Sequence, residues 1–155
     1  MMRFFLTLVL LNVVTILTGL DSLPPPVEPP VPGTLQFSVD NVRDAQGTLW
    51  VGIYHSDDDF LDREKARLVS VKVNREGRAV VKIPGMVQGQ EYALGIFHDV
   101  NDNGEFDTNF FGLPTEPWAF SGTLRSRLRV PRFKEVSFVF DERIKLPILR
   151  LRTWF

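Results

Sequence analysis

One short segment of the chain has the residue types and the spacing of a calcium-binding loop. From Asp99 onward, side chains that carry oxygen recur at alternate positions and a glycine stands at the sixth, which is the pattern of a calcium loop. Calcium takes roughly six to eight oxygen ligands, and the glycine permits the sharp reversal that turns alternate residues toward one centre. The expected ligands are the side chains of Asp99, Asn101, Asn103 and Asp107, together with the backbone carbonyl of Glu105.

The same segment departs from an EF-hand. The twelfth position, where an EF-hand has a bidentate glutamate, is Phe110, and the flanking sequence predicts strands rather than a helix pair. We therefore expect a calcium-type loop on a β scaffold, with a further carboxylate from Glu116 or from residues 57–59 if these lie nearby. Two assured carboxylates predict a dissociation constant of roughly 10⁻⁴ to 10⁻³ M. The alternative is a metal-free turn, which Asp, Asn and Gly also favour.

The two histidines, His55 and His98, each follow a Gly-Ile-aromatic run and precede an acidic loop. If the two strands run in the same direction, both loops emerge at one end of the domain. Two histidines with carboxylates could then hold zinc or copper. Each histidine is also in phase with apolar residues of its strand, which favours a hydrogen-bonded side chain at the edge of the core.

The elements that must position these residues are short strands. Runs of β-branched and aromatic residues alternate with polar ones and are separated by Gly, Asn, Asp and Pro turns, which predicts an all-β, antiparallel sandwich of seven strands, with a closed barrel as the alternative. Residues 74–77 predict a hairpin turn between two of the strands, and 59–66 predict one or two helical turns. The expected strands are 35–39, 49–53, 68–73, 79–83, 92–97, 136–140 and 144–151.

Residues 1–20 predict an N-terminal signal helix for export. Arg3 is the only charged residue before Asp21, and the stretch 4–17 is mostly apolar. That length is typical of the apolar part of a signal peptide and is short for a membrane span, which needs about 20 residues. A cleaved signal peptide is favoured, and an uncleaved anchor is the alternative. Contact with a membrane is expected only if the segment is uncleaved.

A proline-rich linker is expected at residues 21–33. Six of its thirteen residues are proline, which fixes the backbone, removes an amide donor and favours an extended polyproline II conformation. The folded domain is then expected at residues 34–155. Export would place this domain in the periplasm or outside the cell.

Composition excludes several classes of function. The chain has 155 residues with 18 basic and 19 acidic side chains, a net charge of −1, whereas a nucleic-acid-binding protein usually has a basic excess. It has no cysteine, so disulfides, thiolate metal sites and cysteine nucleophiles are excluded. Phosphate-binding, nucleophile-elbow, zinc-protease and dinucleotide motifs are absent from the sequence. We expect no enzyme activity. A small secreted hydrolase that uses Asp99 and Glu116 as a carboxylate pair is a remote alternative.

The segment from His98 to Glu116 reads His-Asp-x-Asn-x-Asn-Gly-x-x-Asp-Thr-Asn-Phe-x-Gly-x-Pro-Thr-Glu. With residues 47–54 before it and Pro131 and Phe133 after it, it resembles a family of small exported bacterial proteins whose domain has no assigned function. The resemblance covers residues 34–152. It implies a seven-stranded Greek-key sandwich, immunoglobulin-like or similar to transthyretin and carboxypeptidase-regulatory domains, and export. It implies no catalytic residue. The chain departs from the family after Ser121, where arginines replace small and Asn-rich residues.

Two groups of residues near the loop are candidates for a ligand surface. Phe110, Phe111 and Trp118 follow the loop, and Arg125, Arg127 and Arg129 alternate, so that on a strand they would share one face. Aromatic side chains beside calcium could hold a glycan, and the arginines could bind an anionic cell-envelope polymer. The alternatives are a small aromatic core under the loop and a solvated strand face. The sequence thus predicts an exported, calcium-binding, non-catalytic β-sandwich module with an unidentified partner.

Overall fold

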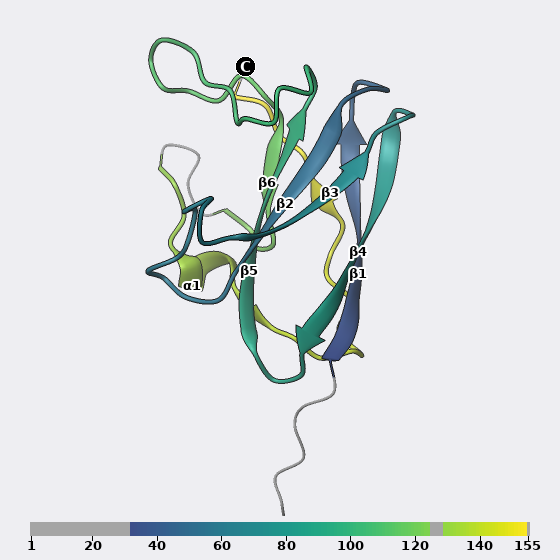
Figure 1. The fold of residues 1–155 in the computed structure, drawn as a ribbon, viewed down its shortest axis with the longest axis vertical. Helices are drawn as coiled ribbons and strands as arrows, with labels where there is room; N and C mark the ends of the chain where they lie inside the picture. Colours follow the sequence, from purple (N-terminus) through teal and green to yellow (C-terminus); the bar gives the residue numbers. More distant parts are fainter. Residues whose placement is uncertain (1–31, 125–128, 155) are drawn as a thin grey trace, which may run out of the picture.

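The computed structural model describes residues 32–124 and 129–154, which form two β-sheets packed face to face (Figure 1). The three-stranded sheet has the order β4-β1-β8, with β1 at Pro32–Val42, β4 at Gly77–Val87 and β8 at Leu149–Arg150. The expected all-β, sandwich-like arrangement is confirmed at this level. Within the described residues, no helix is both long and apolar enough to cross a membrane. The predicted signal and most of the predicted linker lie outside the described residues.

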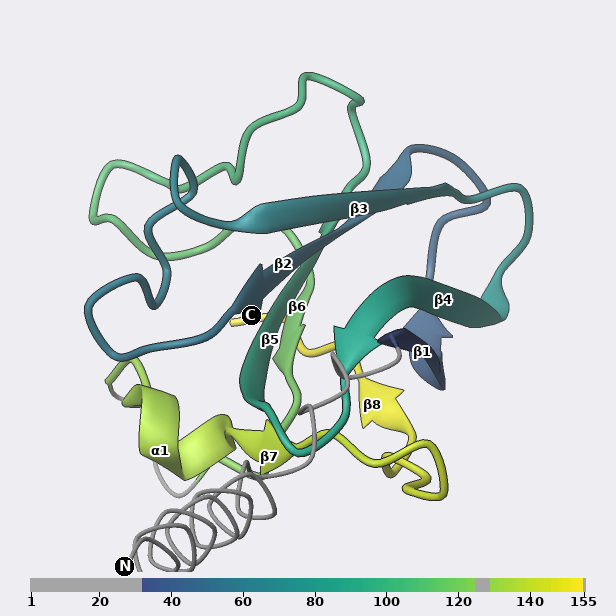
Figure 2. The same cartoon turned by 60° about the horizontal axis from the view of Figure 1, so that its bottom comes forward.

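The five-stranded sheet has the order β3-β2-β5-β6, with β7 pairing beside β5. A short helix, α1, precedes β7 (Figure 2). The bounds of these elements are Thr48–Tyr54 for β2, Arg67–Lys72 for β3, Glu91–Asp99 for β5, Trp118–Phe120 for β6, Phe133–Val136 for α1 and Phe138–Val139 for β7.

The core lies between the sheets and follows from the period-two pattern of the strands. In β1, Leu35, Phe37 and Val39 are buried while the residues between them are more exposed, and in β4 the same holds for Val81 and Ile83. A strand alternates its side chains between its two faces, so one face of each sheet is apolar and is buried against the other sheet.

The structure differs from the expected antiparallel arrangement in two places. β8 pairs with β1 in the parallel sense, Val39 opposite Leu149 and Asp40 opposite Arg150. The predicted hairpin at residues 74–77 is wrong, because β3 pairs with β2 while β4 pairs with β1, so this turn crosses between the sheets. An alternating pattern predicts a strand but does not identify its partner. Here β4 pairs along nearly the whole of β1, from Pro32 opposite Val87 to Val42 opposite Gly77.

Helical structure also lies elsewhere than expected. Residues 59–66 form turns, and Leu61 has φ of 66°, a left-handed conformation that interrupts a helix. The only helix among the described residues, α1, begins after Arg132, whose backbone N–H donates to the Glu135 carboxylate at 2.8 Å. Strand β6 was missed as well, because its three residues follow a proline and are too few to show a period.

Candidate functional site

The loop that follows β5 is fixed at its start by a buried carboxylate. Asp99, the last residue of β5, is 1% exposed. Its Oδ1 accepts the backbone N–H of Asn103 at 3.1 Å, and its Oδ2 accepts the backbone N–H of Gly104 at 2.8 Å and the indole N–H of Trp50 at 3.2 Å. These three hydrogen bonds satisfy a charge that would otherwise be costly to bury, and they fold the loop back over its own start.

The next turns of the loop are formed by asparagine side chains. The Oδ1 of Asn101 accepts the backbone N–H of Asn103 at 3.1 Å, and the Oδ1 of Asn103 accepts the backbone N–H of Glu105 at 2.8 Å. Asp102 and Gly104 have φ of 60° and 78°, a left-handed conformation that Asp and Gly tolerate best. These residue types therefore wind the loop as a series of Asx turns.

Asp107 closes the loop. Its carboxylate accepts the Nδ2 of Asn101 at 2.8 Å and the Nδ2 of Asn103 at 3.1 Å. All five residues predicted to supply ligands are therefore joined by hydrogen bonds within the loop, Glu105 through its backbone N–H.

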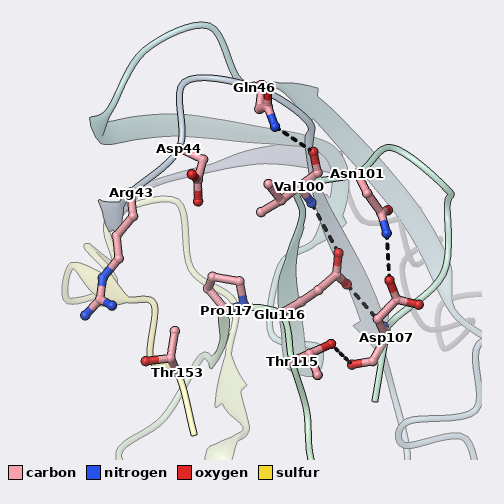
Figure 3. A pocket seen from close by; sticks show the side chains of 10 residues that line it. All are labelled: Arg43, Asp44, Gln46, Val100, Asn101, Asp107, Thr115, Glu116, Pro117 and Thr153. Atoms are coloured by element: carbon pink, nitrogen blue, oxygen red, sulfur yellow. Dashed lines mark hydrogen bonds between the residues drawn. The ribbon is translucent and has the colours of Figure 1, made fainter. Parts of the chain in front are cut away.

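Glu116 lies against this loop, where a further carboxylate was expected, and it is 6% exposed. Its Oε1 accepts the backbone N–H of Val100 and its Oε2 that of Asp107, both at 3.2 Å (Figure 3). Burial raises the pKa of the Glu116 carboxyl. The two backbone donors oppose this rise in pKa, and the negative charges of Asp99 and Asp107 add to it. Glu116 thus joins the first and last residues of the loop.

An open cavity of about 440 Å³ lies beside Glu116. Figure 3 shows Asp44, Asp107 and Glu116 among its lining residues, with the Arg43 guanidinium directed away from Glu116. The other lining residues are Gln46, Val100, Asn101, Thr115, Pro117 and Thr153.

The outward side of the loop is neutralised by a lysine, and the inward side is not. Asp102 accepts the hydroxyl of Thr48 at 2.6 Å and the Nζ of Lys72 at 2.5 Å, and the lysine holds the pKa of this carboxyl below its ordinary value. By contrast, neither Asp99, Asp107 nor Glu116 forms an ion pair with a lysine or arginine of residues 32–124 or 129–154. The two loop carboxylates and the adjacent Glu116 therefore lie together without a basic partner there.

The two histidines lie at opposite ends of the five-stranded sheet. β2 and β5 are antiparallel, with Thr48 opposite Asp99 and Tyr54 opposite Ala93, so the loops that follow them leave from opposite ends. The idea that both loops emerge together is therefore wrong. His55 and His98 cannot share a metal ion, and residues 57–59 cannot add a carboxylate to the 99–107 loop.

His98 is fully buried, and its Nε2 lies 2.8 Å from the backbone carbonyl oxygen of Gln46. Its Nδ1 and the Nε1 of Trp118 are buried without a hydrogen-bond partner among the described residues. His55 is exposed and packs against the ring of Tyr92, with the ring centroids 5.3 Å apart. His98 thus has the buried, hydrogen-bonded surroundings that its apolar phase favoured, whereas His55 is exposed and does not.

The predicted ligand surface is divided by the structure. Phe110 and Phe111 are 98% and 81% exposed and contact each other edge to face, whereas Trp118 is half-buried on β6. Arg129 is bound by both Glu135 oxygens at 2.6 and 2.7 Å. Arg125 and Arg127 lie outside the described residues, so a common face for the arginines stays a prediction.

Three residues that hold the loop were not identified from the sequence. Trp50 binds Asp99, and Thr48 and Lys72 bind Asp102. They come from β2 and β3, about thirty to fifty positions earlier in the chain. The signal that could have identified Trp50 is its indole N–H, a polar group on a strand that needs an acceptor. Only the pairing of Trp50 with Phe97 shows that Trp50 lies close to Asp99.

The chemistry available at this site is that of oxygen ligands. Among the described residues, no group of three or more His, Asp or Glu side chains is arranged to hold a metal ion by itself. A cation at the loop would therefore depend on asparagine and backbone oxygens as well as carboxylates, which suits calcium better than zinc.

Comparison with known proteins gives one match. The family model described as an uncharacterized protein conserved in bacteria (DUF2141) matches residues 37–145, which is more than two thirds of the chain and includes the whole loop. No curated protein and no solved structure matches the chain. The match agrees with the resemblance carried by the His98–Glu116 motif. The chain therefore belongs to the DUF2141 family of uncharacterized bacterial proteins.

Proposed function

We propose that this protein is an exported, non-catalytic β-sandwich module whose loop at residues 99–107 binds calcium. The observation that carries the proposal is that three neighbouring carboxylates, those of Asp99 and Asp107 on the loop and of Glu116 against it, have no basic partner among the described residues. Their mutual repulsion contributes to the raised pKa of Glu116. A bound divalent cation would relieve this repulsion.

The winding of the loop supports calcium in particular. Each carboxylate or amide oxygen has two lone pairs, so an oxygen that accepts a backbone N–H keeps one for a cation. Asn101 and Asn103 direct their Nδ2 atoms toward Asp107. Their Oδ1 atoms accept the backbone N–H groups of Asn103 and Glu105, and each keeps a lone pair for a cation. Asp99, Asn101, Asn103, Asp107 and the Glu105 carbonyl would then supply oxygens, with Glu116 as a further ligand or a support.

Calcium here would be structural. It would hold the loop and the aromatic segment that follows it against the ends of β2 and β5. We infer further that the sandwich is of the transthyretin-like type that the sequence resembles, and that the protein acts in the periplasm or outside the cell.

The experiment is a calcium titration of the full chain. The protein is first freed of metal with EDTA, and its thermal unfolding is then measured at each calcium concentration. A ligand that binds only the folded state raises the unfolding midpoint once its concentration exceeds the dissociation constant. For calcium we expect a dissociation constant of roughly 10⁻⁴ to 10⁻³ M. Magnesium should act more weakly, since it demands a smaller and more regular shell. Terbium, which prefers oxygen ligands, should luminesce on excitation of Trp50, because the Trp50 indole is hydrogen-bonded to Asp99.

Two matched variants make the test specific. Asp107→Asn removes the charge of a carboxylate that accepts hydrogen bonds from the amides of Asn101 and Asn103. Asp102→Asn removes the charge of a carboxylate in the same loop that is already paired with Lys72. The calcium-induced rise should be lost in the first variant and kept in the second. If calcium does not raise the unfolding midpoint of the parent, or if both variants lose the rise equally, the loop is a metal-free turn.

A second candidate function rests on Phe110 and Phe111, whose exposure is high for aromatic side chains. Together with the calcium loop they would form a platform for a glycan or a cell-envelope polymer. A glycan array probed with the parent and with a Phe110→Ser, Phe111→Ser double variant tests it. Binding that the double variant retains would exclude this platform.

A further inference from the structure

A second cavity, of about 440 Å³, lies on the outer face of the five-stranded sheet, and we call it the aromatic cavity. Its floor is formed by the residues of β2 and β5 that point away from the core, with Trp50 opposite Phe97 and Gly52 opposite Gly95. The residues between them, such as Val51, belong to the core between the sheets.

Two connecting segments form the walls of the aromatic cavity. Figures 1 and 2 both show the loop that follows β5 and the segment between β2 and β3 on the side of this sheet away from the three-stranded sheet. The loop contributes Phe106, whose ring packs against Phe97 with centroids 5.2 Å apart; the segment contributes Leu61, and β3 contributes Leu68. Seven aromatic side chains line the cavity, and they include Trp50, Trp118 and Trp154, the three tryptophans of the chain.

The facing glycines make room for a tyrosine. A Cβ on Gly52 would come within 2.7 Å of the Tyr54 hydroxyl oxygen, and a Cβ on Gly95 within 3.5 Å of its ring. The Tyr54 ring therefore lies over both glycines. Burial raises the pKa of the Tyr54 hydroxyl above its ordinary value of 10.

The rim of the aromatic cavity carries one arginine without a carboxylate partner among the described residues. The guanidinium of Arg63 lies 5.7 Å from the centroid of the Trp50 ring, a cation–π contact. Arg129 also lines the cavity, but Glu135 binds it on both nitrogens. Arg63 therefore gives the cavity a positive charge that its walls do not neutralise.

We propose that the aromatic cavity binds a small aromatic anion, a flat apolar ring that carries one carboxylate or sulfonate. The ring would lie against the aromatic walls and the anionic group would meet Arg63. A volume of about 440 Å³, an apolar and aromatic lining and a few polar groups are the usual properties of small-molecule sites. Aromatic rings gain from offset and edge-to-face contacts beyond their buried area. The proposal does not depend on calcium binding.

The test uses quenching of tryptophan fluorescence in the full chain. Because all three tryptophans line the aromatic cavity, a nitroaromatic that enters it quenches them on contact. The two probes are 4-nitrobenzoate and its uncharged counterpart 4-nitrobenzyl alcohol, at constant ionic strength. We expect saturable quenching by both, with the anion bound about three- to tenfold more tightly, the range for one charged contact near a protein surface. Linear, unsaturable quenching by the anion would overturn the proposal.

Arg63→Gln should remove the preference for the anion, while Arg75→Gln, in the exposed turn between β3 and β4, should leave it unchanged. Both positions are exposed, so both variants should fold. If the two variants behave alike, or if the parent binds the alcohol as tightly as the anion, the assignment of Arg63 is wrong and the proposal fails.

Two further controls test the place and the shape of the ligand. Leu68→Tyr adds bulk at the rim of the aromatic cavity, and Val80→Tyr adds it on β4; the parent side chains are 38% and 48% exposed. Only Leu68→Tyr should weaken the binding of 4-nitrobenzoate. Benzoate should displace the probe several-fold better than cyclohexanecarboxylate, which has the same charge and a similar size but no aromatic face. Equal displacement, or equal binding by the two tyrosine variants, would refute an aromatic ligand in this cavity.

Discussion

Replacing Asp99 by asparagine should destabilise the protein strongly even without metal. The carboxylate is 1% exposed and accepts three N–H groups, two on Oδ2 and one on Oδ1. An asparagine has one acceptor oxygen, so if that oxygen takes the Oδ2 place, the Nδ2 group faces the backbone N–H of Asn103. One charge-assisted hydrogen bond is then lost and two become neutral. At about 1.5–3 kcal/mol for a bond to a charged group and about 1 kcal/mol for a neutral one, the loss lies between about 2.5 and 7 kcal/mol. We expect about 3 kcal/mol, at the lower end, because the Asn103 N–H keeps its hydrogen bond to the Oδ1 of Asn101.

The assay is urea unfolding of the full chain in EDTA, followed by circular dichroism and by tryptophan fluorescence. A loss of about 3 kcal/mol is less than the total stability of most domains, about 5–15 kcal/mol, so the variant should still fold. The midpoint should fall while the slope with urea stays that of the parent, since the surface exposed on unfolding does not change.

The matched control is Asp102→Asn in the same loop. Its carboxylate is exposed and bound to Lys72 and Thr48, and exposed ion pairs contribute little to stability. Its midpoint should therefore lie close to that of the parent. If Asp99→Asn shifts the midpoint no more than Asp102→Asn, the buried carboxylate does not fix the loop and the reasoning above is refuted.

Three further predictions concern the surroundings of the loop and the helix. Burial raises the pKa of Glu116 above 4.5, so its ionisation costs stability in the fold. The free energy of unfolding of the parent relative to Glu116→Gln should rise as the pH falls from neutral toward 4.5 in EDTA, and a difference independent of pH would contradict this. The arginine bound to Glu135 holds its pKa at about 2, from 4.5. The stabilisation that Glu135→Gln removes should therefore be full above pH 4.5 and decline toward pH 2, as urea unfolding at several pH values would show. Gly47→Ala and Gly89→Ala place alanine at similar φ, 83° and 79°, but only the Gly47 Cβ would overlap the backbone carbonyl of Asp99. Gly47→Ala should therefore lose about 2 kcal/mol more in the same assay, and equal losses would show that this turn does not pack on the loop.

The loop could be predicted in detail because its conformation is determined locally. Asx turns join residues two positions apart, and Gly104 adopts the left-handed conformation that its lack of a Cβ permits. The positions of most strands could be predicted for a similar reason, because the alternation of apolar and polar residues is a local pattern. The winding of the loop is therefore visible in the sequence, whereas Glu116 was only one of two possible sources of a further carboxylate, and the binding of calcium stays a prediction.

What could not be predicted depends on contacts between distant parts of the chain. The same alternation is consistent with β3 pairing to β4 or to β2, and only the core between the sheets decides. The direction of β2 relative to β5 separates His55 from His98, and no local pattern encodes that direction. Trp50 becomes part of the site only through its register with Phe97.

The parallel pairing of β8 with β1 has a consequence for folding kinetics. Asn41, which interrupts the register of β1 with β4, donates its amide to the Leu151 carbonyl at 2.8 Å across 110 positions of sequence. Closing so long a loop costs chain entropy before any packing compensates for it, and domains rich in such distant contacts fold in milliseconds to seconds. Docking of β8 is thus expected as a late step. Until it docks, β1 presents unpaired backbone groups at residues 39–40, where another unfolded chain could add a strand and begin aggregation.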